Sequence, residues 1–195
     1  MPTRFILIPH CETDFNLQKR LQGQLDIPLN DHGLRQATSL VEVFRDVSIS
    51  AIFSSDLSRC VETARPLARS HGLKVIVHDG LRGRRYGILQ GMLYSEIKRI
   101  FPAFYRSLKH RHQHVRFCEP GGAGESLSEF NGRSLHAVSD CLTRGVVDCG
   151  SDAYIAIVTH GGVLRVVNKN FKRPLFSKGK VLLKAAACQS RESVA

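Results

Sequence analysis

The sequence predicts an α/β protein in which a mostly parallel sheet lies between two layers of helices, a three-layer α/β/α sandwich. Four short apolar runs have the composition of buried strands, and the segments between them carry apolar residues at helical spacing. Strands that alternate with helices favour a parallel sheet that is covered on both faces. The chain of 195 residues contains no internal repeat and no clear linker, which fits one domain over residues 1–195.

The strands are predicted from runs that lack polar residues. These runs are residues 5–8, 51–53, 75–77 and 155–158. All of them are rich in Ile, Val or Phe, whose side chains favour extended backbone. A further apolar run at residues 181–183 offers an additional strand at the edge of the sheet.

Two helices are predicted next to recognisable capping signals. Apolar residues recur at helical spacing over residues 34–44, and Asn30 or Asp31 is expected to cap this helix. Ser126 and Glu129 have the spacing of a capping box, in which each side chain binds the backbone amide of the other residue. Apolar residues on one helical face follow the box, namely Phe130, Leu135, Val138 and Leu142.

The segments between these helices are predicted from weaker signals. Residues 54–56, Ser-Ser-Asp, are expected to cap a helix that runs to about Ser70 and stops at Gly72. Between residues 82 and 124 the pattern is irregular and basic, except for a helix expected near residues 95–108. We interpret the alternating histidines of this region as part of a solvated basic segment rather than as a metal site. They are His110, His112 and His114.

The charge of the chain limits the classes of partner. The formal net charge is +11, from 28 Lys and Arg residues against 17 Asp and Glu residues, which favours a small phosphate ester or a nucleic acid. Aromatic residues amount to 7% and no recognised nucleic-acid-binding motif is present, so nucleic-acid binding is the least favoured hypothesis. No apolar run reaches the ~18 residues of a membrane span and no signal peptide is evident. We therefore expect a cytoplasmic protein without a membrane partner.

Two histidines stand in the same relation to predicted strands. His10 and His160 each follow a buried apolar run at the point where the chain enters a loop. Ligands of open α/β sheets bind outside the carboxyl ends of the strands. Gly161 and Gly162 follow the second histidine and allow backbone to approach a ligand closely. The sequence therefore predicts that both imidazoles converge on one ligand.

Five segments, in order along the chain, resemble motifs of the histidine phosphatase superfamily (phosphoglycerate-mutase-like, branch 1). Residues 8–13, Ile-Pro-His-Cys-Glu-Thr, resemble its R-H-G-E-T signature, and residues 54–59 resemble its S-D-L-x-R helix start. The other three resemble its L-R-E…G…G segment, its P-G-G-E-S loop and its second-histidine motif, and they are residues 81–91, 121–126 and 158–162. The resemblance spans about residues 3–166 and implies a phosphoglycerate-mutase-like fold.

The resemblance also implies a mechanism. His10 is the implied nucleophile, which attacks phosphorus to form a phosphohistidine that water then hydrolyses. Neutral imidazole, with an unperturbed pKa of about 6.5, is available for this attack at neutral pH. Arg59 and His160 are the implied donors to the transferring phosphoryl group. The implied substrate-binding residues are Asn16, Gln22, Gly23, Arg82, Glu125, Ser126 and Gly161. For Glu125 and Ser126, capping of the next helix is an equally favoured role. The implied partner is a small phosphorylated metabolite, with no metal and no other cofactor.

Three positions depart from the family signature. The arginine before the nucleophile is Pro9 here, the glycine after it is Cys11, and the glutamate that donates a proton is Gly83. Proline has no charge and no amide hydrogen, cysteine strains a backbone that needs positive φ, and glycine has no proton to donate. The candidates for a replacement cation are Arg20, Arg82, Arg84 and Arg85, and those for a replacement acid are Glu12 and Glu125.

The sequence therefore favours phosphoglycerate-mutase-like or histidine-phosphatase-type hydrolysis of a small phosphate monoester at a reduced rate. A relative that binds a phosphorylated ligand without turning it over is the alternative. A mutase is less favoured, because returning the phosphoryl group to a bound intermediate requires a complete set of charges around it. Residues 82–124 are expected to form a lid beside the site, and residues 169–195 an atypical basic tail.

Overall fold

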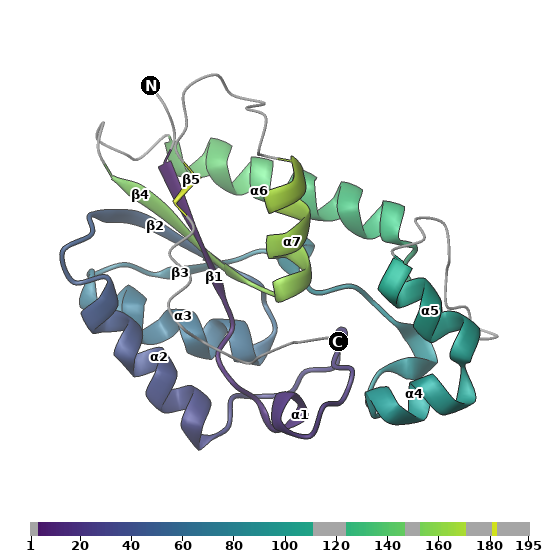
Figure 1. The fold of residues 1–195 in the computed structure, drawn as a ribbon. Coiled ribbons are helices and arrows are strands. Elements are labelled where there is room, and N and C mark those ends of the chain that lie inside the picture. Colours follow the sequence, from purple (N-terminus) through teal and green to yellow (C-terminus); the bar gives the residue numbers. More distant parts are fainter. Residues whose placement is uncertain (1–3, 111–123, 147–152, 171–180, 183–195) are drawn as a thin grey trace.

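A computed structural model describes residues 4–110, 124–146, 153–170 and 181–182 (Figure 1). Its sheet contains five strands in the order β3-β2-β4-β1-β5, and every pairing between them is parallel. The strands are β1 (Arg4–Pro9), β2 (Ile49–Ser54), β3 (Val75–Val77), β4 (Tyr154–Thr159) and β5 (Val181–Leu182). The four predicted strands and the additional edge strand are confirmed, except that Leu183 lies outside the described residues.

The strand order places β1 beside β4, although the two are far apart in the sequence. Their register pairs Pro9 with Thr159 at the carboxyl ends of the strands. The next residues along the chain are His10 and His160, and the backbone amide of His10 donates to the oxygen of Thr159 over 2.8 Å. The topology of the sheet therefore brings both histidines to the same edge.

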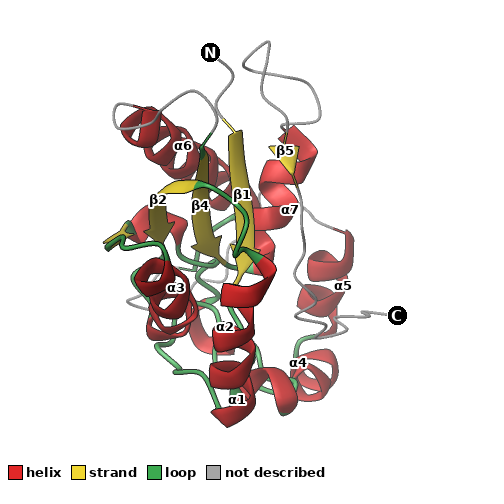
Figure 2. Ribbon diagram, turned by 90° about the vertical axis from the view of Figure 1, so that its left-hand side faces the viewer, coloured by secondary structure: helices red, strands yellow, loops and turns green. Residues whose placement is uncertain are grey.

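Helices cover both faces of this sheet (Figure 2). They are α1 (Asp14–Leu17), α2 (Asp31–Val43), α3 (Ser58–Ser70), α4 (Tyr94–Ile100), α5 (Pro102–His110), α6 (Leu127–Val146) and α7 (Gly161–Asn170), with two short 3-10 helices, η1 (Asp79–Leu81) and η2 (Gly87–Leu89). Helices α2 and α3 pack on one face, and α6 and α7 pack on the other. The predicted three-layer α/β/α sandwich is confirmed. Within the described ranges, no helix is both long and apolar enough to span a membrane.

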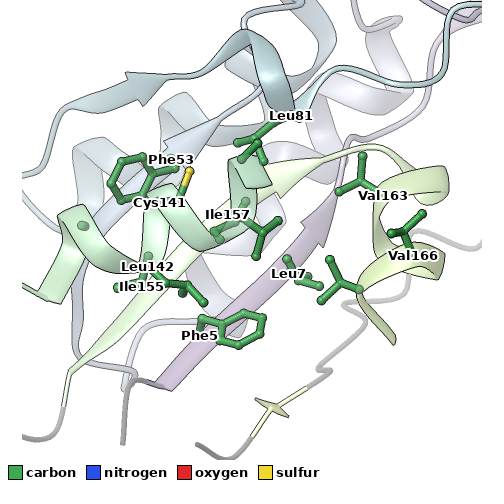
Figure 3. Close-up of a cluster of buried hydrophobic side chains, with 14 of the residues drawn as sticks. Phe5, Leu7, Phe53, Leu81, Cys141, Leu142, Ile155, Ile157, Val163 and Val166 are labelled. Atoms are coloured by element: carbon green, nitrogen blue, oxygen red, sulfur yellow. The ribbon is translucent and has the colours of Figure 1, made fainter. Parts of the chain in front are cut away.

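The core divides into two clusters because successive side chains of a strand point to opposite faces. Phe5 and Leu7 pack with side chains from α6 and α7, as Figure 3 shows. Ile6 and Ile8 pack with side chains from α2 and α3. Both faces of β1 are therefore buried, which explains why its sequence is apolar throughout and does not alternate between apolar and polar residues.

Asn30, rather than Asp31, caps helix α2. Its side-chain oxygen accepts a hydrogen bond from the amide of Gly33 over 2.8 Å, and Asp31 is the first residue of the helix. At the end of α3, Gly72 adopts φ +65°. There its amide binds the oxygen of Arg69 and the next amide binds that of Ala68, the pattern of a Schellman stop. The predicted role of Gly72 is confirmed.

The prediction that residues 54–56 cap helix α3 was wrong. The helix begins at Ser58, and the N-cap residue Leu57 has no capping side chain. The cap comes from a distant loop, because the carboxylate of Asp26 accepts from the amide of Ser58 over 2.7 Å and from its hydroxyl over 2.8 Å. The hydroxyl of Ser55 accepts from the amide of Leu57, before the helix begins, and contacts His160, and the carboxylate of Asp56 pairs with Arg82.

The helix predicted near residues 95–108 is two helices. Helix α4 ends at Ile100 and α5 begins at Pro102. Proline lacks an amide hydrogen and restricts the residue before it, so it starts a helix more readily than it continues one. These two helices and η2 enclose a third apolar cluster around Ile97. His110 is the last residue of α5, whereas His112, His114 and most of the predicted tail lie outside the described residues.

Candidate active site

His10 and His160 meet at the carboxyl ends of β1 and β4. Their ring centroids lie 5.2 Å apart, and the planes of the rings are inclined by 64°. His160 is buried, and His10 is partly buried beside it. The structure therefore brings together the two imidazoles that the sequence analysis singled out.

The hydrogen bond of His10 assigns the proton of the neutral ring to one of its two nitrogens. Nδ1 lies 2.8 Å from the backbone oxygen of Cys11, and a carbonyl oxygen can only accept, so Nδ1 carries the proton. Nε2 of the neutral ring is then unprotonated. Burial, and next the charge of Arg59, lower the pKa of His10 to about 4, against the hydrogen bond to Cys11, which raises it. At neutral pH the ring is uncharged and its Nε2 is nucleophilic.

His160 is held on both sides of its ring. Nε2 lies 3.0 Å from Oγ of Ser55 and 3.5 Å from Sγ of Cys60. Nδ1 lies 3.4 Å from Nη2 of Arg59. Burial first, then His10, Arg59 and Arg133, hold the pKa of His160 well below its usual value.

Arg59 supplies a buried positive charge next to these rings. Only 1% of its surface is exposed. Its Nη1 donates to the oxygen of Leu25 over 2.7 Å and its Nη2 to that of Gly23 over 2.9 Å. Its Nε is buried and has no hydrogen-bond partner among the described residues. A buried donor without a partner is uncommon in proteins, so an anionic ligand is a reasonable partner for this guanidinium.

The loop that contains Gln22 and Gly23 contacts Arg59 and lies next to Gly83. Gly23 has φ +57°, and a Cβ on it would lie 2.2 Å from Oε1 of Gln90, so this position requires glycine. Gln22 is buried, and its Oε1 also lacks a partner among the described residues. Asn16 completes the capping box of helix α1, because its side-chain oxygen accepts from the amide and the hydroxyl of the N-cap residue Thr13.

Two of the implied substrate-binding residues form ion pairs within the protein. Arg82 donates through two nitrogens to the carboxylate of Asp56. Glu125 accepts from Nε of Arg133 over 2.7 Å and from its Nη2 over 2.8 Å. The carboxylate of Glu125 therefore does not cap α6. The charges of both side chains are therefore paired within the protein.

The remaining two implied contacts lie at helix starts. Ser126 forms the predicted capping box, because its hydroxyl accepts from the amide of Glu129 and the Glu129 carboxylate accepts from the amide of Ser126. The capping role of Ser126 is confirmed, and its contact with phosphate stays a prediction. Gly161 is the first residue of α7, and a Cβ there would contact nothing within 4 Å. Gly162 is more confined, since its Cβ would lie 3.1 Å from Cζ of Phe130.

The three departures from the family signature have different structural consequences. Cys11 is buried, and positive φ occurs at no described non-glycine residue other than Lys19, so the predicted strain at Cys11 was wrong. Pro9 breaks no ladder bond to β4, because the amide on that side belongs to His10. Gly83 lies against the site, and a Cβ on it would be 3.4 Å from Cγ of His160.

Most of the proposed replacements for the missing groups bind elsewhere, and the fourth candidate cation, Arg85, is exposed. Arg20 donates to the oxygen of Gly91, Arg84 to the oxygen of Glu125, and Arg82 pairs with Asp56. Glu12 accepts from the side-chain amide of Asn30, and Glu125 pairs with Arg133. The guanidinium that lies against His160 is that of Arg59.

Two residues of the site were not identified from the sequence. Ser55 binds His160, although its motif indicated only a helix cap. Arg133 donates to the backbone oxygens of Gly80 over 2.8 Å, Arg82 over 3.0 Å and Gly83 over 3.1 Å, and so ties this segment to α6. No local pattern reveals such a contact, since its partners lie in a distant loop.

These observations define an α/β protein with two histidines and a buried arginine at the carboxyl edge of its sheet. A sequence profile of the histidine phosphatase superfamily (branch 1) matches residues 5–179, and the chain belongs to this family. Phosphoglycerate mutase-like protein 4 of Arabidopsis thaliana is 36% identical over 162 residues, which are 82% of this chain and 67% of the relative. Glucosyl-3-phosphoglycerate phosphatase of Mycolicibacterium vanbaalenii is 32% identical over 163 residues, which are 83% of this chain and 70% of the relative.

Solved structures show the same relationship. A mycobacterial glucosyl-3-phosphoglycerate phosphatase, solved in complex with VO3, matches this chain with a TM-score of 0.67 and 30% identity. The matched region is 83% of this chain and 78% of the solved chain. A protein described as mycobacterial hydrolase 2 matches with a TM-score of 0.70 and 32% identity. The matched region is 83% of this chain and 69% of the solved chain. The phosphoglycerate-mutase-like fold expected from the sequence is confirmed.

Proposed function

We propose that this protein hydrolyses a small phosphate monoester through a phosphohistidine on His10, at a reduced rate. The observation that carries the proposal is the contact of His10 Nδ1 with the backbone oxygen of Cys11, which places the ring proton on Nδ1, in a ring that lies 5.2 Å from that of His160. Relatives named as phosphatases of glucosyl-3-phosphoglycerate and of phosphoserine support a small phosphorylated substrate.

The residues around His10 have separate tasks in this proposal. Nε2 of His10 attacks phosphorus, and water then displaces the phosphoryl group from the same nitrogen. Arg59, whose charge is fixed by two backbone carbonyl oxygens, neutralises the equatorial oxygens of the phosphoryl group. The neutral state of His10 at pH 7 follows from its low pKa of about 4.

The reduced rate follows from Pro9 and Gly83. Loss of one donor to a developing oxyanion costs roughly 10²–10³ in rate. Loss of a general acid costs roughly 10²–10⁴ when the leaving group is a strong base. The same two positions favour a second candidate function, a protein that binds a phosphorylated ligand without turning it over. The engagement of Glu12 and Glu125 with Asn30 and Arg133 supports this alternative.

One experiment separates the two candidates. The protein is incubated with 4-nitrophenyl phosphate and quenched in base, and phosphorylated His10 is sought by mass spectrometry, with His10→Gln as the control. A phosphoryl group on His10, absent in the control, is the expected result. If neither adduct nor turnover appears, but both appear in the double variant Pro9→Arg with Gly83→Glu, the protein is a binding protein derived from an enzyme.

A further inference from the structure

The contacts of His160 determine which of its ring nitrogens carries the proton. A guanidinium can only donate, so Nδ1, which lies 3.4 Å from Nη2 of Arg59, must be the accepting nitrogen. Nε2 of the neutral ring then carries the proton and donates it to Oγ of Ser55, 3.0 Å away. His160 therefore has the opposite tautomer to His10, whose proton is on Nδ1.

Nδ1 is also the nitrogen of His160 that is oriented toward position 83. A Cβ on Gly83 would lie 3.6 Å from Nδ1, so this residue approaches the nitrogen without covering it. The other nitrogen is enclosed by Ser55 and Cys60, which are both fully buried. Of the two ring nitrogens, Nδ1 is therefore the one on the side of position 83, and Nε2 faces Ser55 and Cys60.

We propose that His160 takes up a proton at Nδ1 when a phosphate monoester dianion binds, and that it delivers this proton to the leaving oxygen while Ser55 holds the Nε2 proton. This inference rests on the proposed function and adds a proton donor to it. His160 would then take over the task of the acid that is absent at position 83. Ser55 is a positioning residue, because it acts through His160.

The charges around His160 explain why the proton arrives with the ligand. The groups that face the ring are His10 after β1, Arg59 and Cys60 on α3, and Arg133 on α6. Burial first, then His10 and the two arginines, keep the pKa of His160 low. Cys60 adds no negative charge that would offset them, because burial raises the pKa of its thiol to about 12. A dianion next to Nδ1 reverses this balance, since an opposite charge in contact favours the protonated ring.

The proton and electron balance of the two steps is complete. Nε2 of His10 forms a bond to phosphorus, the bond from phosphorus to the ester oxygen breaks, and that oxygen leaves as an alcohol with the Nδ1 proton of His160. Water then attacks the phosphohistidine, the phosphorus–nitrogen bond breaks and its electron pair returns to Nε2 of His10. The water proton goes to Nδ1 of His160 and is released to solvent when hydrogen phosphate leaves, so His160 returns to its neutral state and takes up a proton again with the next substrate. Ester and water give alcohol and phosphate, with no other reactant.

Ring-nitrogen NMR tests the proposal with sulfate as the probe, because sulfate is a dianion that carries no proton at neutral pH. Long-range 1H–15N spectra distinguish the two neutral tautomers from the imidazolium. We expect His160 to be neutral with its proton on Nε2 in the free protein, and doubly protonated at saturating sulfate. His160→Gln assigns the signals. His71, which is the C-cap residue of α3 and contacts backbone oxygens there, is the internal control, and its ring-nitrogen signals should not change with sulfate.

The possible outcomes separate this inference from the proposed function. If sulfate shifts the signals of His10 and His160 but His160 stays neutral, or if free His160 carries its proton on Nδ1, the proton-donor inference is overturned. If sulfate shifts neither histidine, the anion site itself is absent and the proposed function fails with it. In Ser55→Ala, His160 should lose its single tautomer while His10 keeps its own. An unchanged His160 tautomer in that variant would remove Ser55 from the proposal.

Discussion

Nη2 of Arg59 donates to the backbone oxygen of Gly23 over 2.9 Å, and this contact fixes the direction of a charge that is almost entirely buried. The oxygen of Leu25 holds the neighbouring Nη1 over 2.7 Å. The buried guanidinium is therefore oriented by backbone rather than by a carboxylate. This leaves its charge available to an incoming anion.

Replacing Arg59 by Lys is expected to weaken anion binding strongly while keeping the charge. A single ammonium group cannot reach both carbonyl oxygens and His160 as the planar guanidinium does. One buried acceptor is then left without a donor, at a cost of about 1–3 kcal/mol in the free energy of unfolding. Vanadate affinity should fall by roughly 10–100-fold. Urea unfolding and vanadate titration check the two effects, and equal vanadate affinity of both proteins would contradict this role of Arg59.

Two glycines of the site are expected to respond oppositely to the same substitution. Gly23→Ala places a Cβ at positive φ and 2.2 Å from Oε1 of Gln90, so the free energy of unfolding should fall by about 1–3 kcal/mol. Gly161→Ala meets nothing within 4 Å at the start of a helix and should be neutral or stabilising by up to about 1 kcal/mol. Thermal unfolding compares the two variants. A similar destabilisation in both would show that backbone conformation is not what position 23 requires.

The fold and the pairing of the histidines could be predicted because both depend on local features. Apolar runs identify buried strands, and a residue that follows a parallel strand reaches the ligand-binding edge whichever strands are neighbours. The partners of the charged side chains could not be predicted in this way. Asp26 caps the helix at Ser58, and Asp56 pairs with Arg82, across gaps in sequence that no periodicity spans. The strain expected at Cys11 was wrong because it assumed a backbone conformation that the chain does not adopt.

Arg133 is expected to stabilise the segment that carries Gly83. In Arg133→Ala three backbone oxygens and the carboxylate of Glu125 lose their donor, so the free energy of unfolding should fall by about 2–4 kcal/mol. Arg144→Ala, on the same helix, is the control. That side chain is 52% exposed, pairs with Asp140 over 3.4 Å and lies 5.6 Å from the centroid of the Phe53 ring, so its loss should cost no more than about 1 kcal/mol. If both variants lose the same free energy of unfolding in urea, the contacts of Arg133 stabilise the protein no more than those of Arg144 do.

The stability of the protein is expected to fall as the pH is lowered from about 6.5 toward 4. The pKa of His10 in the folded protein is about 4, below the ordinary histidine value of 6.5, and that of His160 is lowered as well. The unfolded chain therefore binds protons in this range that the folded protein does not, so the stabilisation is complete above pH 6.5 and is lost as the pH falls. His10 alone should account for roughly 3 kcal/mol of the change. Urea unfolding at pH 7 and pH 4.5 measures the difference.

The variant that tests this pH dependence is His10→Gln. It removes a buried group that resists protonation and should flatten the dependence. Saturating sulfate should also flatten the dependence at the acid end, because a bound dianion favours the protonated rings. If the slope of stability against pH is the same in His10→Gln as in the parent protein, His10 is not held neutral by the fold, and the reason for its nucleophilicity at neutral pH is lost.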